Sequence, residues 1–471
     1  MHSVFIKTFG CQMNEYDSEK IFALLSADHR PVSSAEEADF VFVNTCSVRE
    51  KGEHKLFSLL GRLRDLKETK PNLVVGVGGC VAQQEGKNII KRAPSVDFVV
   101  GTHNLSLVPS LLNSAKKGAT GQVAVDYRDE WEELPEELDS YSPLKQGEQK
   151  ELDSSFGVFY SPVRAMVAIQ RGCNKNCSFC VVPTTRGPEV SRSFAEIERE
   201  IKHKVAIGAR EVMLLGQTVN SWGRDLQPRS SFEELVQRIS EIEKLERIRF
   251  TSPHPAEVRP GFIDLYATNP KLCPSIHMPL QSGSNRLLKE MNRNYKVERY
   301  LEIVDQVREV RPDIAISTDV IVGFPGETED DFEQTMQVIE KVRYQLIYSF
   351  LYSPRPNTVA LEKYGVDTEP GREIAGTRLS RLQKRASEIA GEINSAKVGQ
   401  DSTLLIEKID KKPNGSQLIR GRSPENVAVE IDLSGSSELS KVNSNDRQLV
   451  GSLLSYRVKS ASPHGLYGDI L

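Results

Sequence analysis

The amino-acid sequence predicts an α/β protein with three parts: an N-terminal parallel α/β domain, a central partial (β/α)6 barrel and a small C-terminal β-barrel. Strand-like and helix-like segments alternate twice along the chain, which predicts the first two parts. A final run of short strands with polar turns predicts the third. We therefore expect domains at residues 1–118, 159–397 and 398–471, with an acidic linker at 119–158.

The N-terminal part contains apolar segments that are typical of buried parallel strands, separated by helical patterns. These segments are Val4–Thr8, Phe40–Asn44, Leu73–Val77 and Phe98–Val100. Cysteines follow three of them, at Cys11, Cys46 and Cys80. Because the carboxyl ends of parallel strands share one edge of a sheet, we expect these three thiols to meet in space. The neighbouring Gly10, Gly78 and Gly79 are expected to leave room there for a bulky inorganic group.

The central part repeats the alternation over a longer stretch. Its expected strands are Val163–Gln170, Glu211–Leu215, Arg247–Thr251, Ser275–Pro279, Ala315–Val322 and Leu346–Leu351. The expected helices between them include Phe194–Ile207, Phe232–Leu245 and Val297–Val310. Six such units predict a partial barrel rather than the full barrel of eight units. Short strands at Ser402–Lys408, Ser416–Gly421, Asn426–Ile431 and Leu453–Ser460 predict the C-terminal barrel.

Composition favours a protein of a reducing compartment. No apolar stretch is long enough to span a membrane, Met1-His2-Ser3 leads directly into a strand, and the cysteines show no disulfide framework. The net charge of −4 is a mild argument against RNA binding, although much of the acid lies between Asp129 and Asp153. Helical residues Arg378, Arg381, Lys384 and Arg385 predict a solvated helix face, with a phosphate-binding face as the alternative.

Cys173, Cys177 and Cys180 form a C-x₃-C-x₂-C pattern on one short loop. Three thiolates can hold three irons of a four-iron cluster and leave the fourth iron open for chemistry. The alternative is a structural zinc site, which requires a fourth ligand, and no other Cys or His lies near this loop in the sequence. The seventh cysteine, Cys273, is interpreted as a core or wall residue.

Together these cysteines and their neighbours resemble the methylthiotransferase family of radical S-adenosylmethionine (SAM) enzymes, over nearly the whole chain. The matching motifs are Gly10-Cys11-Gln12-Met13-Asn14, Asn44-Thr45-Cys46-Ser47-Val48-Arg49-Glu50, Gly79-Cys80-Val81-Ala82 and the Cys173 loop. Within the family, residues 12–14, 47–50 and 181–183 follow the branch that acts on N6-(dimethylallyl)adenosine in tRNA. Branches that act on threonylcarbamoyl-adenosine or on a ribosomal protein side chain are the alternatives.

The resemblance implies methylthiolation of carbon 2 of the prenylated adenosine at position 37 of tRNA, next to the anticodon. It implies two 4Fe-4S clusters, one on Cys173, Cys177 and Cys180 and the other on Cys11, Cys46 and Cys80. It also implies two SAM molecules per turnover, one that methylates a sulfur and one that supplies a 5′-deoxyadenosyl radical. The clusters then carry the chemistry, and no catalytic side chain is expected.

The implied partners are tRNA with a prenylated adenosine, an electron donor such as flavodoxin or ferredoxin, and a sulfur carrier or sulfide source. We expect a cytoplasmic monomer that does not bind membranes. The C-terminal barrel resembles the TRAM domain, an RNA-binding module. Its basic residues, which are expected to contact tRNA phosphates, are Lys408, Lys411, Lys412, Arg420 and Arg422.

Polar residues at the carboxyl ends of the barrel strands are expected to bind SAM, because reactive groups gather at that end of a barrel. They are Gln217, Ser252, His254, Gln281, Arg293, Asp319 and Gly323. Gly323 is expected to let the backbone approach the adenosine of SAM, and Arg293 to bind its carboxylate or a phosphate. For each residue the alternative is an ordinary hydrogen-bonded strand end or a surface salt bridge. A non-catalytic iron–sulfur protein that binds RNA or transfers electrons would require no such ring of residues.

Overall fold

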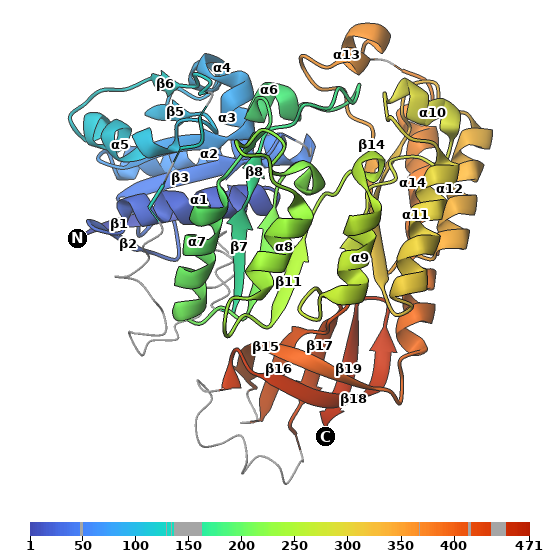
Figure 1. Cartoon of the computed structure of the whole chain (residues 1–471). Helices are drawn as coiled ribbons and strands as arrows, with labels where there is room; N and C mark the ends of the chain where they lie inside the picture. Colours follow the sequence, from blue (N-terminus) through green and yellow to red (C-terminus); the bar gives the residue numbers. More distant parts are fainter. Residues whose placement is uncertain are drawn as a thin grey trace.

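The computed structural model describes residues 1–47, 50–128, 130–132, 134–135, 163–366, 368–412, 416–434 and 449–471. Figure 1 shows an N-terminal α/β part beside a central barrel of strands and helices, with a small β-barrel beneath both. The predicted fold class is confirmed. Val48, Arg49 and most of the acidic stretch from 129 to 153 lie outside the described residues.

The N-terminal sheet has six parallel strands in the order β2-β1-β3-β4-β5-β6. The elements are β1 (His2–Phe9), α1 (Gln12–Leu25), β2 (His29–Pro31), β3 (Phe40–Thr45), α2 (Glu50–Thr69), β4 (Val74–Gly79), α3 (Cys80–Glu85), α4 (Lys87–Arg92), β5 (Phe98–Val100), α5 (Val108–Lys116) and β6 (Gln122–Ala124). Helices α1 and α5 pack on one face and α2 and α4 on the other. Both faces are therefore apolar, which explains the continuous hydrophobic runs.

Two strands of this sheet were not predicted, β2 and β6, and each is only three residues long. Strand β5 is equally short but entirely apolar, whereas β2 (His-Arg-Pro) and β6 (Gln-Val-Ala) contain polar residues or proline and so lack an apolar run. Strand β6 pairs with β5 and lies in the range predicted as linker, so the sheet continues beyond residue 118.

The central barrel consists of two three-stranded parallel sheets, β11-β10-β7 and β12-β13-β14. Its strands are β7 (Arg164–Ala168), β10 (Glu211–Leu215), β11 (Arg247–Phe250), β12 (Ser275–His277), β13 (Ala315–Val322) and β14 (Leu346–Leu351). Its covering helices are α7 (Phe194–Ala206), α8 (Phe232–Ser240), α9 (Pro260–Thr268), α11 (Val297–Val310), α12 (Glu329–Val342) and α14 (Arg372–Ser395). A bridge between Ile248 and Leu272 joins the two sheets. These are the six predicted strand–helix units.

The strands turn apolar side chains outward to the helices, and on β13 polar side chains alternate with them on the inner face. On β13, Ile316 and Val320 belong to the main core, while Ser317 and Asp319 alternate with them on the inner face. Near β7 the inner face is covered by the N-terminal part, because Met13 and Tyr16 of α1 pack against Met166, Met213 and Leu215. The helix that begins after Cys11 therefore lies against the inner side of the barrel strands.

The C-terminal barrel is closed, in the order β15-β16-β17-β19-β18. Its strands are β15 (Asp401–Lys411), β16 (Gln417–Arg422), β17 (Ala428–Asp432), β18 (Leu453–Ser462) and β19 (Gly465–Ile470), and β19 was missed in the sequence. It is attached to the amino end of β11, where Arg247 donates to the carbonyl of Arg422 at 2.8 Å and Arg249 to that of Ser423 at 2.9 Å. Figure 1 shows this barrel at the opposite end of the central barrel from α6 (Val182–Arg186).

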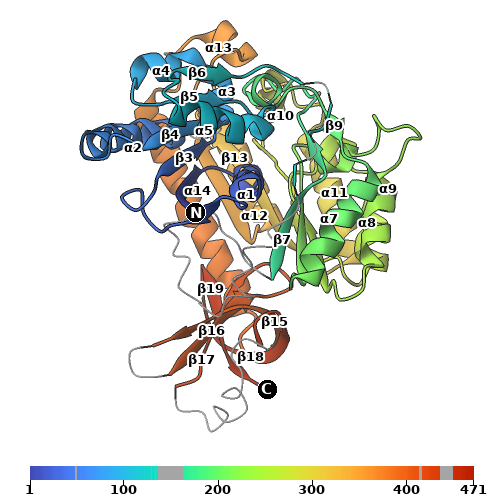
Figure 2. The same ribbon diagram turned by 90° about the vertical axis from the view of Figure 1, so that its left-hand side faces the viewer.

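The arginines of α14 form ion pairs with acidic residues of the neighbouring segment. Arg378 is buried and pairs with Glu327 at 3.0 Å and Glu329 at 2.9 Å, and Arg385 pairs with Glu340 at 2.5 Å. Figure 2 shows α14 running from the central barrel down to the C-terminal barrel. The buried Arg378 thus departs from the predicted solvated face, whereas Arg381, which pairs with Glu329, and Lys384 are exposed as predicted. No helix within the described residues is long and apolar enough to cross a lipid bilayer.

Candidate functional site

The structure brings Cys11, Cys46 and Cys80 together at one edge of the N-terminal sheet. Strands β1, β3 and β4 are neighbours, and their last residues Phe9, Thr45 and Gly79 are in register. The Cys46 N–H donates to the Phe9 carbonyl at 2.8 Å. A hydrogen bond with Cys46 lowers the pKa of Cys11 to about 6, and burial raises the pKa of the Cys80 thiol.

The glycines at this edge make room for protein atoms rather than for an inorganic group. A Cβ on Gly10 would lie 2.6 Å from the side chain of Asn14, and one on Gly79 would lie 2.3 Å from Asn44 Oδ1. The two asparagines are joined by a hydrogen bond of 3.0 Å. A Cβ on Gly78 would lie 2.4 Å from the ring of Phe42. The expectation for these glycines is therefore corrected: they admit the asparagine pair and an aromatic ring that support the cysteine edge.

Cys173, Cys177 and Cys180 are half-buried on the loop before α6. This loop lies against the end of α10 (Asn285–Glu290), where the Ser178 hydroxyl donates to the Glu290 carbonyl at 2.8 Å. Its Cys173 N–H also donates to the Gly187 carbonyl at 3.1 Å. The loop is thus fixed at both sides, as a site for a rigid cofactor requires.

The sulfur atoms of the loop face hydrogen-bond donors. Arg293 Nη1 lies 3.3 Å from Cys177 Sγ, and the Lys175 N–H lies 3.4 Å from Cys173 Sγ. Thr218 Oγ1 lies 3.5 Å from Cys173 Sγ. Burial raises the pKa of Cys180 to about 12, so its thiolate needs a positive partner such as a metal cluster. Three thiols on one loop, with donors facing the sulfurs of Cys173 and Cys177, are a ligand set that fits a four-iron cluster.

In the described part of the chain, no three His, Cys, Asp or Glu side chains are arranged around a single metal ion. Each cysteine of a four-iron cluster binds a different iron, so such thiols stand farther apart than the ligands of one ion.

Two of the seven strand-end residues, Arg293 and His254, lie beside the Cys173 loop, and a third, Gln217, precedes Thr218, which contacts it. Besides its contact with Cys177, Arg293 lies 5.1 Å from the ring of Tyr295, and that ring lies 5.8 Å from His254. Burial, Arg293 and Lys175 lower the pKa of His254 to about 3, so this imidazole is neutral. Its Nδ1 accepts from the Ala256 N–H at 3.2 Å, which leaves the proton on Nε2. The Gln217 side-chain oxygen is buried and has no hydrogen-bond partner among the described residues.

Asp319 lies farther along the inner face, where its carboxylate is 3.3 Å from His277 Nε2. Gln281 bridges to β13 by its main chain, and both Gln281 and Ser252 have a positive φ, of 70° and 56°. Sequence reasoning selected Gln217 rather than the neighbouring Thr218, and it missed Lys175 and Tyr295 as site residues. Thr218 and Lys175 adjoin motif positions, so proximity in sequence was an available signal.

The role expected for Gly323 is not supported by its surroundings. A Cβ at this position would lie 2.5 Å from Ala375 Cβ on α14, and the Gly323 N–H donates to Glu327 at 2.9 Å. Its φ of +75° also favours glycine. Close packing of a helix therefore accounts for this glycine without a ligand.

The two cysteine sites are connected through α6, which begins two residues after Cys180. Arg186, its last residue, pairs with Asp17 of α1 at 2.6 Å, and both side chains are buried. Burial opposes the charge on Arg186, but Asp17 and the Cys80 thiol raise its pKa well above the usual value. Thr102, which follows β5, donates to the Thr185 carbonyl at 2.6 Å. One buried contact region therefore adjoins both sets of cysteines.

The predicted basic patch on the C-terminal barrel is paired with acidic residues. Lys408 and Arg420 pair with Asp410 at 2.7 and 2.6 Å, and Lys412 pairs with Asp432 at 2.6 Å. These pairs are largely exposed, so each contributes about 1 kcal/mol or less and can exchange for a phosphate.

Comparisons with known proteins identify the family. Residues 167–339 match the Radical SAM superfamily, and residues 3–101 match uncharacterized protein family UPF0004. A tRNA-2-methylthio-N(6)-dimethylallyladenosine synthase of Ralstonia pickettii is 41% identical over 100% of this chain and 98% of its own. The chain belongs to the family of these tRNA-2-methylthio-N(6)-dimethylallyladenosine synthases. Relatives with the same name are 45% identical in Sulfurovum, over 93% of this chain and 95% of theirs, and 42% in Geobacter metallireducens, over 99% and 98%.

The fold of the family extends to more distant enzymes. The radical SAM methyltransferase TsrM from Kitasatospora setae, solved with cobalamin and a [4Fe-4S] cluster bound, superposes with a TM-score of 0.55 at 16% identity. The alignment covers 78% of this chain and 76% of TsrM. The similarity places the central barrel among the radical SAM folds.

Proposed function

We propose that this protein is a tRNA methylthiotransferase that uses radical SAM chemistry to place a methylthio group on carbon 2 of N6-(dimethylallyl)adenosine, next to the anticodon. The observation that carries the proposal is the presence of two three-thiol sites, on the Cys173 loop and at the edge of the N-terminal sheet, joined by the buried Arg186–Asp17 pair. A single cluster would suffice for radical formation, so a second three-thiol site supports a second task, the delivery of sulfur. The names of the full-length relatives support the same acceptor.

The six cysteines would hold two 4Fe-4S clusters, each with one iron free of protein ligands. When bound, the clusters supply an electron for SAM cleavage and a place for the sulfur that is transferred. The chain's own part is to bind and orient. Arg293, Lys175 and Thr218 donate to the sulfurs of the Cys173 loop and hold their charge in place.

SAM would lie over the carboxyl ends of the barrel strands. Neutral His254 offers an Nε2–H, Gln217 a side-chain oxygen without a partner among the described residues, and Arg293 a guanidinium beside Cys177. Ser252 after β11, and Gln281 and Asp319 on the side of β12 and β13, complete this end of the barrel, and Gly323 is left out because it packs against α14. Two SAM molecules per turnover follow from the transfer of a methyl group as well as a radical step.

The substrate would be tRNA, held in part by phosphate contacts of the C-terminal barrel, with an external electron donor and an external sulfur source. We place the reaction in the cytoplasm, where tRNA and reduced thiols are found. A monomer contains both cysteine sites and needs no second copy.

The test is mass spectrometry of nucleosides from digested tRNA of cells with and without the gene. The methylthio derivative of prenylated adenosine should disappear in the deletion strain while prenylated adenosine accumulates. Loss of a methylthio group from threonylcarbamoyl-adenosine, with the prenylated nucleoside unchanged, would assign the enzyme to the other tRNA branch. An unaltered tRNA together with a change in a ribosomal protein's mass would contradict a tRNA substrate altogether.

A further inference from the structure

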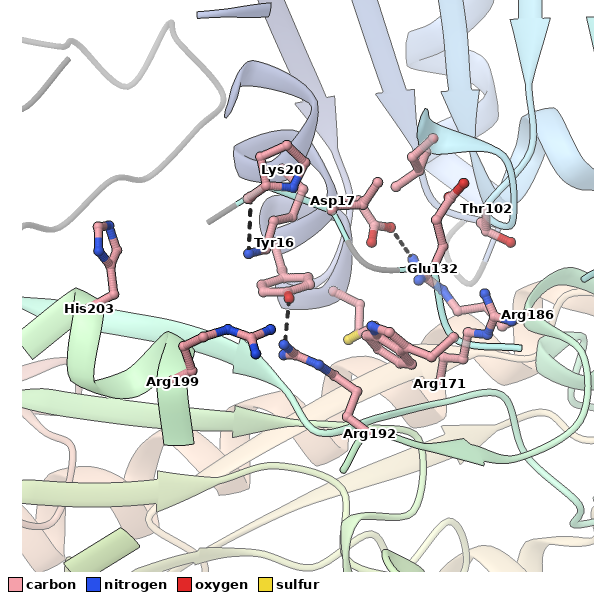
Figure 3. A pocket seen from close by; sticks show the side chains of 15 residues that line it. Tyr16, Asp17, Lys20, Thr102, Glu132, Arg171, Arg186, Arg192, Arg199 and His203 are labelled. Atoms are coloured by element: carbon pink, nitrogen blue, oxygen red, sulfur yellow. Dashed lines mark hydrogen bonds and ion pairs between the residues drawn. The ribbon is translucent and has the colours of Figure 1, made fainter. Parts of the chain in front are cut away.

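A cavity of about 540 Å³ lies at the junction of the N-terminal part and the central barrel. Figure 3 shows α1 above it, with Tyr16, Asp17 and Lys20, and Arg171 and Arg192 of the barrel below. Arg199 and His203 of α7 lie on one side of it, and Trp131 and Glu132 also line it. None of the seven strand-end residues lines it, so it is separate from the place proposed for SAM. The volume lies within the range of about 300–1,000 Å³ that small-molecule sites occupy.

The lining is strongly cationic. Five basic side chains face two carboxylates, those of Asp17 and Glu132, and the basic ones are Lys20, Arg171, Arg186, Arg192 and Arg199. A third carboxylate, Glu200, is fully buried beside the cavity and pairs with Lys20 at 3.0 Å and Arg192 at 2.5 Å. The positive charges therefore still outnumber the negative ones. A cavity with such an excess of cations concentrates anions.

Two of the arginines have donors that no group of the described residues uses. Arg171 and Arg192 are 7% and 5% exposed, and the Nε–H of each has no hydrogen-bond partner among the described residues. Among the described residues, Arg171 also forms no ion pair with a carboxylate. Its guanidinium donates instead to the main-chain carbonyls of Arg128 and Glu130. A buried guanidinium N–H without a partner costs free energy, and an anionic oxygen in the cavity would supply one.

The cavity walls add planar and apolar surface. The centre of the Trp131 ring lies 5.8 Å from the guanidinium carbon of Arg171 and 5.3 Å from that of Arg192. Tyr16, Met13 and Leu105 also line the cavity. A guanidinium group can donate two parallel hydrogen bonds to one phosphate, and an aromatic side chain can stack on a planar nucleobase. The combination fits a phosphate ester that carries a planar group.

We propose that this cavity binds a phosphate group of nucleotide chemistry, either a phosphate of the RNA backbone or that of a free nucleotide. Arg171 and Arg192 donate to its oxygens, and Arg199 attracts it at the rim. Because Arg186 lines the cavity and also pairs with Asp17 between the two cysteine sites, a bound phosphate adjoins the contact region that connects them. The RNA form of the proposal rests on the proposed function, whereas the nucleotide form does not.

The test uses inorganic phosphate, adenosine 5′-monophosphate (AMP) and an unmodified anticodon stem-loop RNA as probes on the full chain. Trp131 is one of two tryptophans, and the other, Trp222, is buried away from the cavity lining. AMP should therefore change the Trp131 fluorescence in a saturable way with one site per chain. In Trp131→Phe this signal should vanish, while calorimetry still detects binding.

Arg171→Gln and the exposed rim variant Arg199→Gln should each weaken AMP or RNA binding by about tenfold or more. Lys202→Gln removes a charge from the same helix outside the cavity and should change affinity by less than about twofold. The rim variant keeps the test valid if Arg171→Gln folds poorly. Competition between AMP and the RNA would assign the cavity to the RNA backbone, and simultaneous binding would assign it to a free nucleotide. If neither AMP nor RNA loses affinity in either arginine variant, the proposal is overturned. A negative tRNA assay with intact AMP binding would reject the proposed function alone.

Discussion

The two cysteine sites are built in opposite ways. Cys173, Cys177 and Cys180 lie on one loop, where the Cys180 N–H donates to the Cys177 carbonyl at 3.1 Å. Cys11, Cys46 and Cys80 lie at the ends of three strands and meet only because β1, β3 and β4 pair in one register. The first site depends on a local turn and its contact with α10, while the second depends on the fold of the whole N-terminal sheet. A change in one site should therefore leave the other formed, except where a shared contact links them.

The largest expected effect is on the local site. Cys177→Ala should reduce formation of 5′-deoxyadenosine to the background, because the loop loses one of three ligands and the partner of Arg293. Cys273→Ala is the matched control, since it removes a buried thiol that belongs to neither set. SAM cleavage at a normal rate by Cys177→Ala, measured by chromatography with a chemical reductant, would mean that this loop does not hold the radical cluster.

The assembled site should fail differently. Cys46→Ala should leave SAM cleavage measurable and eliminate the methylthio product, because the Cys173 loop keeps all its ligands. Iron should fall from about eight to about four atoms per chain, as the loss of one of two cubane clusters requires. The measurement is the iron content per chain of the reconstituted wild type and Cys46→Ala proteins. An unchanged iron content would exclude a second cluster on Cys46.

The contrast also explains what sequence could predict. A spacing of three cysteines within one loop is readable without a fold, and the sheet edge followed from strand order and the topology rule. The strand limits Glu211–Leu215, Ala315–Val322 and Leu346–Leu351 were predicted to the residue because their apolar patterns are long and regular. Among the short strands the outcome was mixed: the apolar β5 (Phe98–Val100) was also predicted to the residue, whereas β2, β6 and the antiparallel strand β9 (Val190–Ser191), which pairs with β8 (Gln170–Arg171), were not predicted.

Side-chain partners were the less predictable part. Gly323 and Gly79 looked like room for a ligand, yet each faces a protein atom, of Ala375 or Asn44, that is distant in sequence. The arginines of α14 were predicted to form a solvated helix face and those of the C-terminal barrel to contact phosphates, and most of those described are paired with carboxylates. Charge sums and single residues do not reveal such pairs, because tertiary contacts decide them. The cationic cavity was missed for the same reason, since its lining comes from several separate segments.

The shared contact predicts a change that affects both sites. Asp17→Asn leaves the buried Arg186 without its carboxylate, which should lower the free energy of unfolding by about 3–5 kcal/mol. The iron content of the N-terminal site should fall more than that of the loop, because Asp17 belongs to the helix that begins after Cys11. Asp28→Asn, an exposed position of the same region, is the control. Equal stability of the two variants in urea titrations would show that the pair does not connect the sites.

The junction of α1 and α7 should give the protein a pH dependence. Burial favours the neutral form of Glu200, but Lys20, Arg192 and Lys204 lower its pKa to about 2. Because the folded pKa lies below the ordinary value of 4.5, the stabilisation is present above that pH and is lost as pH falls toward 2. It amounts to about 3 kcal/mol. Glu200→Gln should therefore be less stable at pH 7 and less sensitive to acid, and Glu198→Gln, which is partly exposed on the same helix, should keep the wild-type profile. Parallel pH curves for Glu200→Gln and wild type would contradict this assignment.

The smallest expected effect concerns the C-terminal barrel. Deleting residues 398–471 would be a poor test, because it would remove the carbonyls of Arg422 and Ser423 that accept from Arg247 and Arg249 and expose a face of the central barrel that is normally covered. The double variant Lys408→Gln/Lys411→Gln keeps that attachment. If these lysines bind tRNA phosphates, the slope of log affinity against log salt should decrease by about one for each lysine–phosphate pair that the substitutions remove.

SAM cleavage without tRNA should not change, because the barrel lies at the opposite end of the molecule from α6 and the adjoining cysteine loop. Lys459→Gln, on β18 of the same barrel, is the control for removal of a surface charge. An identical salt slope for the double variant and this control would move tRNA binding away from the predicted patch and leave the cationic cavity at α1 as the principal phosphate site.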